Sequence, residues 1–472
     1  MIFRSWCWYL GFCFLAACKI GPDYARLEEK LPDKWVNILK TQGENDQTVA
    51  WWSHFNDPIL TDLIETVAAQ NLDLKSAEAL ILQNQALLDE NIANLFPQFN
   101  VSTSVTTNQS SKNYKMFGLH RRYDAYSNTL GMNWEIDLFG QLRRAKEAAF
   151  AELGVQIENC YGVFLSLVSN VAETYIQLRG AQQKLMIAQQ LAQKYKELYT
   201  LQMTLQQAGI TNQINVENAK GLWERYEAML HPLEAAIKTY MHSLSLLTAK
   251  EPTALYDLLA PLKDIPTMQP TMFLGLPSQL LERRPDIRKA EMSLMRATAQ
   301  IGVAKGGLFP SFSLTGIVGY QSSMPSNFTS PGNIVYSAGP GLNWNIFDFG
   351  RVRSEIKSSE AFKDQAQLAY RQIILKALSE VEGALVSYAE ETKRLHNLTK
   401  AKESQNKSAD LVRDRFNAGL EPFSTSLEAD ISVLNNILNL LDSQTNVALD
   451  TVNIYKALGG GWESYAKETV KN

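Results

Sequence analysis

The chain has 472 residues, of which 45% are hydrophobic and 20% are charged, and its formal net charge is −4. This composition is typical of a folded protein with a sizeable core, and it excludes a disordered chain or a membrane protein with many spanning helices. The slightly acidic balance offers no basic surface, so binding to nucleic acid is excluded as a function.

The segment 1–17 predicts a signal peptide, because Arg4 precedes an apolar run at 6–15. The stretch Leu-Ala-Ala-Cys at 15–18 matches the lipobox of bacterial lipoproteins. Cleavage before Cys18 would leave a thiol that carries a diacylglycerol, with an ordinary signal peptide as the alternative. The next residue is Lys19 rather than the aspartate that resembles an inner-membrane retention signal, which indicates sorting to the outer membrane.

The remaining cysteine pattern excludes a disulfide framework. Of four cysteines, two lie in the signal peptide and one is Cys18, so only Cys160 is left as a free thiol. Downstream of the signal there is no run of about eighteen apolar residues, so no helix is expected to span a bilayer. A mature chain that crosses a membrane would therefore use β-strands.

Two successive sets of elements are predicted after a lipidated segment at 18–56, which forms part of an equatorial collar. The first set spans 57–250, with a helix, a β-hairpin at 98–138, a long helix at 140–208 and a return helix at 211–249. A proline-rich linker follows at 251–275. The second set spans 276–460, with a helix, a hairpin at 311–348, a long helix at 350–418 and a return helix at 421–458, before a tail at 461–472.

The two sets are duplicates. The stretch Asn133–Gly140 recurs as Asn343–Gly350, at an offset of 210 positions in the numbering. The Phe-Pro pair at 96–97 recurs at 309–310, at a second offset of 213. Agreement of several markers at two nearly equal offsets indicates an internal repeat rather than chance.

The long helices carry the pattern of a coiled coil. Their apolar residues fall at alternating spacings of four and three, and the pattern returns at the offset of 210. A helix of this length would measure roughly 100 Å. Gly209 and Gly419 are expected to end the two helices in left-handed turns. Pro232 lies inside the first return helix and is expected to bend it.

The hairpins alternate apolar and polar residues with the period of a half-buried strand. Each strand has about ten residues, enough for a tilted strand to cross a bilayer, and Trp134 and Trp344 suit an interfacial belt. A soluble sheet packed on a core is the alternative, but no globular body lies between the long helices. Four strands leave two open edges, so three copies of the chain would close a barrel of twelve strands. Pro340 removes one ladder hydrogen bond, and its accommodation is left open.

Three motifs resemble those of the outer-membrane efflux protein family, specifically its TolC-like lipoproteins that serve resistance-nodulation-division (RND) pumps. They are the lipidated start at 18–24, the stretch Arg-Arg-Pro-Asp-Ile at 283–287 and the ending at 457–462. The resemblance covers nearly the whole mature chain.

The resemblance implies an α+β fold in which an all-antiparallel transmembrane β-barrel, with four strands from each protomer of a homotrimer, continues into a long α-helical barrel in the periplasm. It implies a passive exit duct in the outer membrane, surrounded by lipid and without a cofactor or metal. A periplasmic adaptor protein and an inner-membrane RND-type pump are the implied partners. The helix turns at Gly209 and Gly419 would lie at the periplasmic aperture, where family members close their tunnel and meet the adaptor.

The same resemblance singles out residues just after the second turn. Thr425 and Glu428 occupy positions where family members often place carboxylates in a closing ring, and this chain keeps only Glu428. Three Glu428 side chains would repel one another unless they are paired, and Arg413 or Arg415 could supply the partners. The alternative is that Glu428 is a solvated helix residue.

No catalytic arrangement is predicted. The five histidines have no metal-ligand spacing, and the Asp-Phe-Gly at 348–350 lacks the other motifs of a kinase. A membrane-tethered coiled-coil structural or adaptor lipoprotein without a pore is the rival function, although an adaptor would carry one helical hairpin rather than two duplicated sets. The transported substrate is left open among drugs, metal ions, lipid precursors and secreted peptides.

Overall fold

The computed structural model describes residues 19–26, 32, 35, 50–111, 113, 122–268 and 280–469. Cys18 and the predicted signal peptide therefore lie outside the described residues, as do most of the first hairpin loop and part of the linker at 251–275. Across these described ranges, none of the helices combines the length and the apolar character needed to cross a membrane.

The chain forms two compact units, and each takes matching segments from both repeats. The first unit contains Ala79–Ile157, Lys289–Arg371 and the N-terminal residues up to Glu28. The second unit contains Glu29–Glu78, Glu158–Arg288 and Gln372–Asn472. The duplication is therefore visible in the packing as well as in the sequence.

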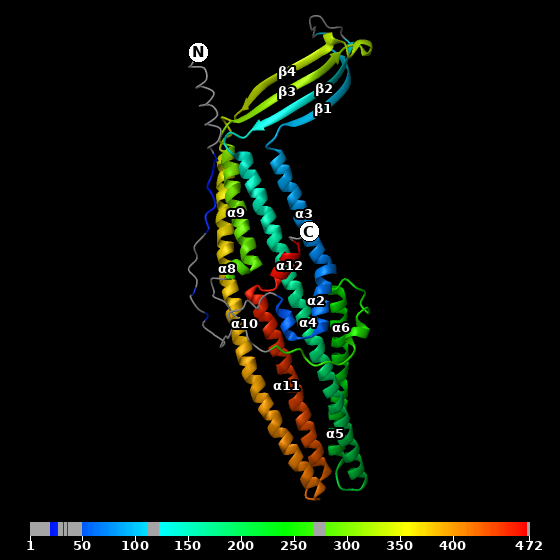
Figure 1. The fold of residues 1–472 in the computed structure, drawn as a ribbon. Coiled ribbons are helices and arrows are strands. Elements are labelled where there is room, and N and C mark those ends of the chain that lie inside the picture. Colours follow the sequence, from blue (N-terminus) through cyan, green and yellow to red (C-terminus); the bar gives the residue numbers. More distant parts are fainter. Residues whose placement is uncertain are drawn as a thin grey trace. The chain divides into compact units, whose positions relative to one another are not determined.

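Long helices dominate both repeats (Figure 1). The longest are α4 (Gln141–Gln207) and α10 (Arg351–Asn417), with 67 residues each. At 1.5 Å per residue each rises about 100 Å. Each follows a strand pair and a shorter helix of 22 residues, α3 (Leu72–Ala93) in the first repeat and α9 (Pro285–Gly306) in the second.

The return helices differ between the two copies. In the second copy α11 (Phe423–Leu458) is continuous over 36 residues. In the first copy Met229 separates α5 (Gln213–Ala228) from α6 (Leu230–Leu247). Pro232 has no amide hydrogen for the carbonyl four residues earlier, and its ring crowds that carbonyl. The expectation of one continuous return helix is thus corrected to two helices that meet where the proline was expected to bend them.

Shorter elements complete the chain. They are η1 (Trp51–Phe55), α2 (Pro58–Gln70), α7 (Tyr256–Leu259), α8 (Leu280–Arg283), η3 (Pro325–Asn327), η4 (Pro331–Asn333) and α12 (Trp462–Thr469). The C-terminal helix α12 packs on α4 within the second unit, where Trp462 stacks on Tyr161 and Tyr465 stacks on Phe164, with ring centroids 4.7 and 4.8 Å apart.

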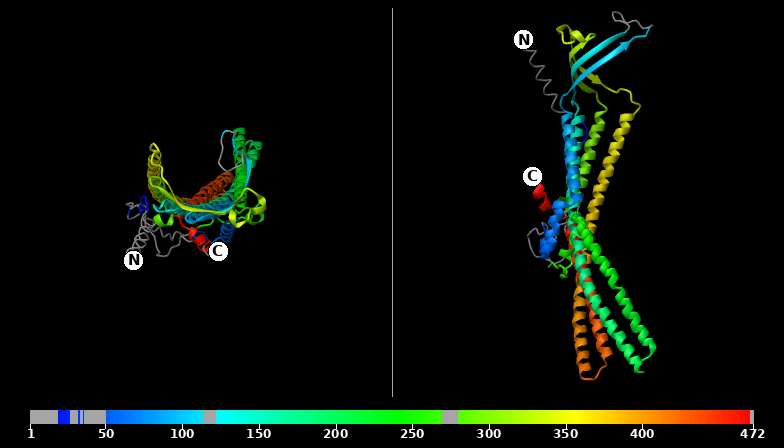
Figure 2. Two further views of the ribbon diagram at one scale, coloured as in Figure 1. Left: turned by 90° about the horizontal axis from the view of Figure 1, so that it is seen from above. Right: turned by 90° about the vertical axis from the view of Figure 1, so that its right-hand side faces the viewer.

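The first unit carries a single antiparallel sheet in the order β1-β2-β3-β4 (Figure 1). The strands are β1 (Gln98–Gln109), β2 (Arg122–Ile136), β3 (Ser311–Ser322) and β4 (Ile334–Asn343). Pairing of β2 with β3 joins the hairpins of the two repeats. The sheet is bowed when it is seen from above (Figure 2). Strands β1 and β4 are the edges, each with one neighbouring strand in the chain.

The register gathers apolar residues of all four strands on one face of the sheet. A row of directly opposed residues crosses it, formed by Val101, Leu130, Val318 and Tyr336. These side chains are between 45% and 83% exposed. The other face is mainly polar, as in the row formed by Gln98, Asn133, Thr315 and Gly339. The predicted alternation therefore produces one apolar and one polar face.

The last strand is shorter than predicted. Strand β4 ends at Asn343, so Trp344 and the residues after it lie beyond the sheet, although the hairpin was expected to reach 348. Pro340 lies opposite Leu314 on this strand. Within a single chain β4 is an edge strand, a place in a sheet where proline occurs.

Matching tryptophans fasten the ends of both hairpins. The indole N–H of Trp134 donates to the carbonyl of Leu95 at 2.9 Å, and that of Trp344 donates to the carbonyl of Leu308 at 3.1 Å. Each leucine directly precedes the repeated Phe-Pro pair. One hydrogen bond in each copy thus joins the two repeated motifs, which gives a physical reason for their recurrence together.

Candidate aperture at the helical tips

Two helix turns in the second unit have the same geometry. The backbone φ is +72° at Gly209 and +73° at Gly419, in the left-handed region that favours glycine. The amide after each glycine donates to the carbonyl five positions before it, at 2.8 Å in both copies. Each long helix therefore reverses into its return helix through the same hydrogen-bonded turn.

We call the ends of the helices at Gly209 and Gly419 the tips. They expose apolar side chains beside these turns. Ile210 is 72% exposed and Ile214 is 67% exposed in the first copy, while Leu420 is 66% exposed and Phe423 is 44% exposed in the second. Large apolar groups at the ends of otherwise solvated helices are typical of a surface that another protein covers.

An apolar core joins the helices of the two copies above the tips. It lies among α4, α5 and α11 and contains Ile187, Leu191, Tyr195, Leu198, Ala219, Leu427 and Ile431. The ring of Tyr226 stacks on Tyr195 with centroids 4.4 Å apart, and its hydroxyl donates to Asn435 Oδ1 at 3.1 Å. The first return helix is thus tied to α11 by both packing and a hydrogen bond.

A short network of charges crosses the same region. Asp430 of α11 accepts a hydrogen bond from Arg413 Nη2 of α10 at 3.1 Å. The other carboxylate oxygen of Asp430 lies 3.5 Å from Lys194 Nζ of α4. Arg413 also pairs with Asp410 on its own helix at 3.0 Å. Asp430 therefore contacts both α10 of its own copy and the long helix of the first copy, and Asp442 of α11 makes a second ion pair with that helix, at Lys184.

A groove of about 800 Å³ lies between α4, α10 and α11 beside this network. Its α4 wall carries amide side chains, namely Gln189, Gln190 and Gln193. Met186, Val433 and Leu434 add an apolar part to the lining, which is therefore mixed. The three charged residues of the network, Lys194, Arg413 and Asp430, are also part of this lining.

The residues that sequence reasoning selected for the aperture do not all meet. Arg415 Nη2 pairs with Glu421 Oε1 at 3.0 Å, and Arg413 is held by the network above. Glu428 is exposed, and within the described ranges it forms no ion pair. The two arginines considered as its partners are therefore engaged elsewhere in one chain. Thr425 is half-buried, and its amide donates to the Pro422 carbonyl at 3.1 Å.

Lys194 and Asp430 were missed by sequence reasoning. Attention to the apolar seam left aside the charged positions that flank it, although flanking charges are the usual links between helices of a coiled coil. Opposite charges beside the seam of α4 and of α11 were the available signal.

The sequence profile of the family "Outer membrane efflux protein" matches residues 63–250 and 276–460. Nodulation protein T of Rhizobium leguminosarum bv. trifolii is 28% identical over 457 residues, which is 96% of each chain. The toluene efflux pump outer membrane protein TtgF of Pseudomonas putida is 27% identical over 469 residues, again 96% of each chain.

Solved structures agree with the fold. The outer-membrane channel OprN superposes with a TM-score of 0.86 at 30% identity, over 94% of this chain and 100% of that one. The Campylobacter jejuni CmeC outer membrane channel superposes with a TM-score of 0.87 at 22% identity, over 96% and 98% of the two chains, a likeness of fold alone.

Proposed function

This chain belongs to the outer membrane efflux protein family, and we propose that it forms, as a homotrimer, a passive exit duct for drugs or other small molecules. The duct would be the outer-membrane component of a tripartite system. A periplasmic adaptor protein and an inner-membrane RND-type pump would be its partners, and pump energy would be supplied by the latter. The repeats at 57–250 and 276–460 would then be the two wall segments that each protomer contributes.

The observation that carries the proposal is the two-faced sheet with open edges. Its apolar row is exposed across all four strands, and nothing among the described residues covers it. A soluble sheet would bury such a face, whereas a sheet in a bilayer turns it toward lipid. The unpaired sides of β1 and β4 leave backbone groups that lipid cannot satisfy. Pairing of β4 with β1 of the next protomer would satisfy these backbone groups and close a ring whose apolar face contacts lipid.

The polar face then determines what passes through. In a closed ring the serine, threonine, asparagine and glycine residues on the face away from the apolar row would line the lumen. By barrel scaling, eight strands are filled by side chains and sixteen hold water, so twelve strands leave room for small solutes. The TtgF relative is described as part of a toluene efflux pump, and we propose small organic molecules as the cargo class.

The tips provide a place for closure and docking. We propose that Glu428 and Thr425 of three copies line the periplasmic aperture, with Arg415 held outside it by Glu421. The Lys194–Asp430–Arg413 network would keep the helix pairs in the closed arrangement. The exposed apolar residues at Gly209 and Gly419 would receive the adaptor, whose binding energy would favour an open arrangement.

Conductance of the purified trimer in planar lipid bilayers tests the proposal. We expect discrete cation-preferring channels, with a larger open fraction once the network at Asp430 is removed. A trimer that never conducts, even with that network removed, would instead favour the non-conducting structural or adaptor lipoprotein. Accumulation of a panel of dyes and antibiotics in a strain that lacks the gene identifies the cargo, and equal accumulation with and without it would contradict the role in export.

A further inference from the structure

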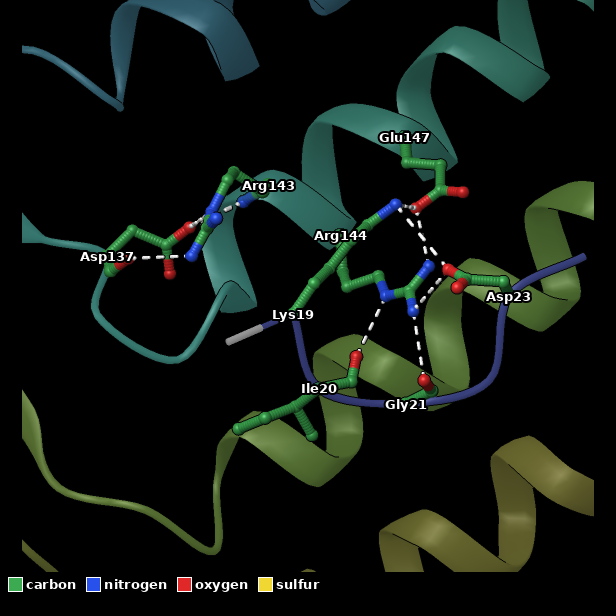
Figure 3. Close-up of polar contacts among 8 residues, drawn as sticks. All are labelled: Lys19, Ile20, Gly21, Asp23, Asp137, Arg143, Arg144 and Glu147. Carbon is green, nitrogen blue, oxygen red and sulfur yellow. Dashed lines mark hydrogen bonds and ion pairs between the residues drawn. The ribbon is translucent and has the colours of Figure 1, made fainter. Parts of the chain in front are cut away.

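The N-terminal segment of the first unit is held by specific hydrogen bonds and ion pairs (Figure 3). Residues 19–26 contain no helix or strand, yet they lie against α4 and α9. The amide of Ile20 donates to the carbonyl of Phe139 at 3.1 Å, at the corner where β2 passes into α4. An irregular segment needs specific partners to be held in this way, because it lacks a backbone ladder of its own.

Arg144 supplies most of those partners. Its guanidinium donates from Nε to the Ile20 carbonyl at 2.8 Å and from Nη2 to the Gly21 carbonyl at 2.9 Å. The same Nη2 lies 2.9 Å from Asp23 Oδ1. Arg144 is only 1% exposed, so these are contacts of a buried charge, which are costly to leave unmade.

Glu147 neutralises the buried guanidinium from the other side. Its Oε2 accepts from Arg144 Nη1 at 2.8 Å and lies 2.8 Å from Lys19 Nζ. Burial by itself raises the pKa of Glu147, but the hydrogen bonds and charges of Lys19 and Arg144 outweigh that effect and lower the pKa below its ordinary value. The carboxylate is thus ionised at neutral pH, and it links the first described residue to the helix.

Two glycines form the floor of the site. Gly21 has a φ of +94°, and a methyl group added to it would lie 2.5 Å from the Cα of Gly302 on α9. A methyl group on Gly302 would lie 2.8 Å from the Ile20 carbonyl oxygen and 2.6 Å from Arg144 Cγ. Only glycine allows this backbone-to-helix contact, because any side chain would occupy the space of the docked segment.

The duplication is broken at this site. At the offset of 210 the counterpart of Arg144 is Ser354, and at the offset of 213 the counterpart of Gly302 is Asp89. Neither counterpart could make the same contacts. The neighbouring Arg143, in contrast, pairs with Asp137 at 3.1 Å and has an arginine counterpart, Arg353 (Figure 3). The arginine at 143 thus recurs in the second copy, although its partner Asp137 is replaced by Phe347 there, whereas Arg144 serves a contact that only one copy makes.

We propose that Arg144, Glu147 and Gly302 form a receptor for residues 19–23 of the mature chain, which fixes the exit point of the N-terminal lipid anchor beside the corner between sheet and helix. A group on the residue before Lys19 is tethered by one peptide unit, about 3.8 Å between Cα atoms. The anchor therefore enters the membrane at the rim of the sheet. The lipid itself rests on the proposed function, whereas the receptor does not, since it binds backbone carbonyls.

Trypsin cleavage after Lys19 in the purified full-length trimer measures release of the segment, because a protease cuts the opened form. We expect Arg144→Ala and Gly302→Ala each to raise that cleavage rate at least tenfold, the first by removing donors and the second by filling the floor without changing any charge. Arg144→Lys should fall between them and the native chain. Arg353→Ala removes an equivalent charge from an exposed position of α10 and should leave the rate unchanged.

Unchanged cleavage in both Arg144→Ala and Gly302→Ala would overturn the proposal. A Cys18→Ser chain exported with an ordinary signal peptide separates the receptor from the lipid. It should keep the native protection at Lys19, and loss of protection in it would mean that the acyl chains hold the segment. Conductance recorded on the same samples keeps the two proposals apart, because a silent trimer with the expected cleavage pattern contradicts the duct and leaves the receptor intact.

Discussion

Asn71 and Arg284 occupy equivalent positions in the two repeats, and the side chain of each donates a hydrogen bond to a carbonyl at the C-terminal end of a return helix. Asn71 Nδ2 donates to the Leu247 carbonyl at 2.8 Å, and Arg284 Nη1 donates to the Ala457 carbonyl at 2.7 Å. The two donors are related by the offset of 213 and the two acceptors by the offset of 210, as the repeat requires. Each bond therefore joins the C-terminal end of a return helix to the residue that precedes α3 or α9.

The first prediction concerns these junctions. Arg284 is 7% exposed and also pairs with Asp286 and Glu380 at 2.7 Å. Arg284→Ala would leave the buried carbonyl of Ala457 unsatisfied, and we expect the free energy of unfolding to fall by about 2–3 kcal/mol. Asn71→Ala removes the bond and the cap that its Oδ1 gives to α3, at a cost of about 1–2 kcal/mol. Thermal unfolding followed by circular dichroism measures both, and Arg353→Ala should change nothing. Equal midpoints in all three variants would contradict the junction role.

A second prediction compares two left-handed glycines. Gly419 and Gly459 have φ of +73° and +72°. A methyl group on Gly419 meets no atom within 4 Å, whereas one on Gly459 would lie 2.7 Å from Arg284 Cγ. Gly419→Ala should cost only the backbone strain, about 1–2 kcal/mol. Gly459→Ala should cost more, because it also displaces Arg284. Thermal midpoints give the order of the two variants. An equal or reversed order would show that Arg284 moves away from an added methyl group at little cost in stability.

A third prediction concerns pH. Burial raises the pKa of Glu158 to about 7 against the opposing charge and hydrogen bond of Arg288, whose Nη2 lies 2.6 Å from Oε1. Between pH 4.5 and 7 the Glu158 carboxyl of the folded chain holds a proton that the unfolded chain has released. The contribution of this carboxyl to the free energy of unfolding therefore falls as the pH rises through this window, and it is constant outside it. Glu158→Gln removes that slope, with an effect of about 1–3 kcal/mol at pH 8 relative to pH 5.

The measurement is the difference in thermal midpoint between Glu158→Gln and the native chain at pH 5 and at pH 8. We expect the difference to favour the variant more at pH 8. Glu224→Gln, on an exposed side chain of α5, is the matched control and should give the same difference at both values. A Glu158→Gln difference that is also independent of pH would place the carboxyl outside this titration.

The fourth prediction tests the network at the tips. Asp430→Ala removes the contacts to Lys194 and Arg413, and we expect a several-fold larger open fraction in planar bilayers, because the helix pairs lose their charged link. Asp410→Ala is the control, since Asp410 pairs with Arg413 within one helix and is 69% exposed. Identical open fractions for the two variants would mean that the network does not hold the aperture.

The fifth prediction concerns the proposed ring at Glu428. Glu428→Gln removes three converging charges from a trimer, so the preference for cations should fall, as read from the reversal potential across a potassium chloride gradient. Glu403→Gln changes an exposed glutamate of α10 at a distance along the helix from the turn and should have little effect. Equal shifts in the two variants would return Glu428 to the solvated helix residue of the alternative interpretation.

The sequence by itself determined the duplication, the family, the long helices and the faces of the strands. These features follow from spacing along the chain, because a period near 3.5 or of 2 fixes which side chains share a face wherever the segment lies. Pro232 and the turn glycines were equally legible, since missing amides and positive φ angles act locally.

Tertiary structure decided which distant groups meet. Pairing of β2 with β3 set the apolar row, packing around the ends of the return helices brought Asn71 and Arg284 to their carbonyls, and Asp430 rather than Glu428 paired with Arg413. The receptor around Arg144 needed a corner from one repeat and a helix from the other. Apart from Arg413 and Asp430, which lie on successive helices, the partners in these contacts are more than 100 positions apart. Burial and geometry that no local period encodes select them.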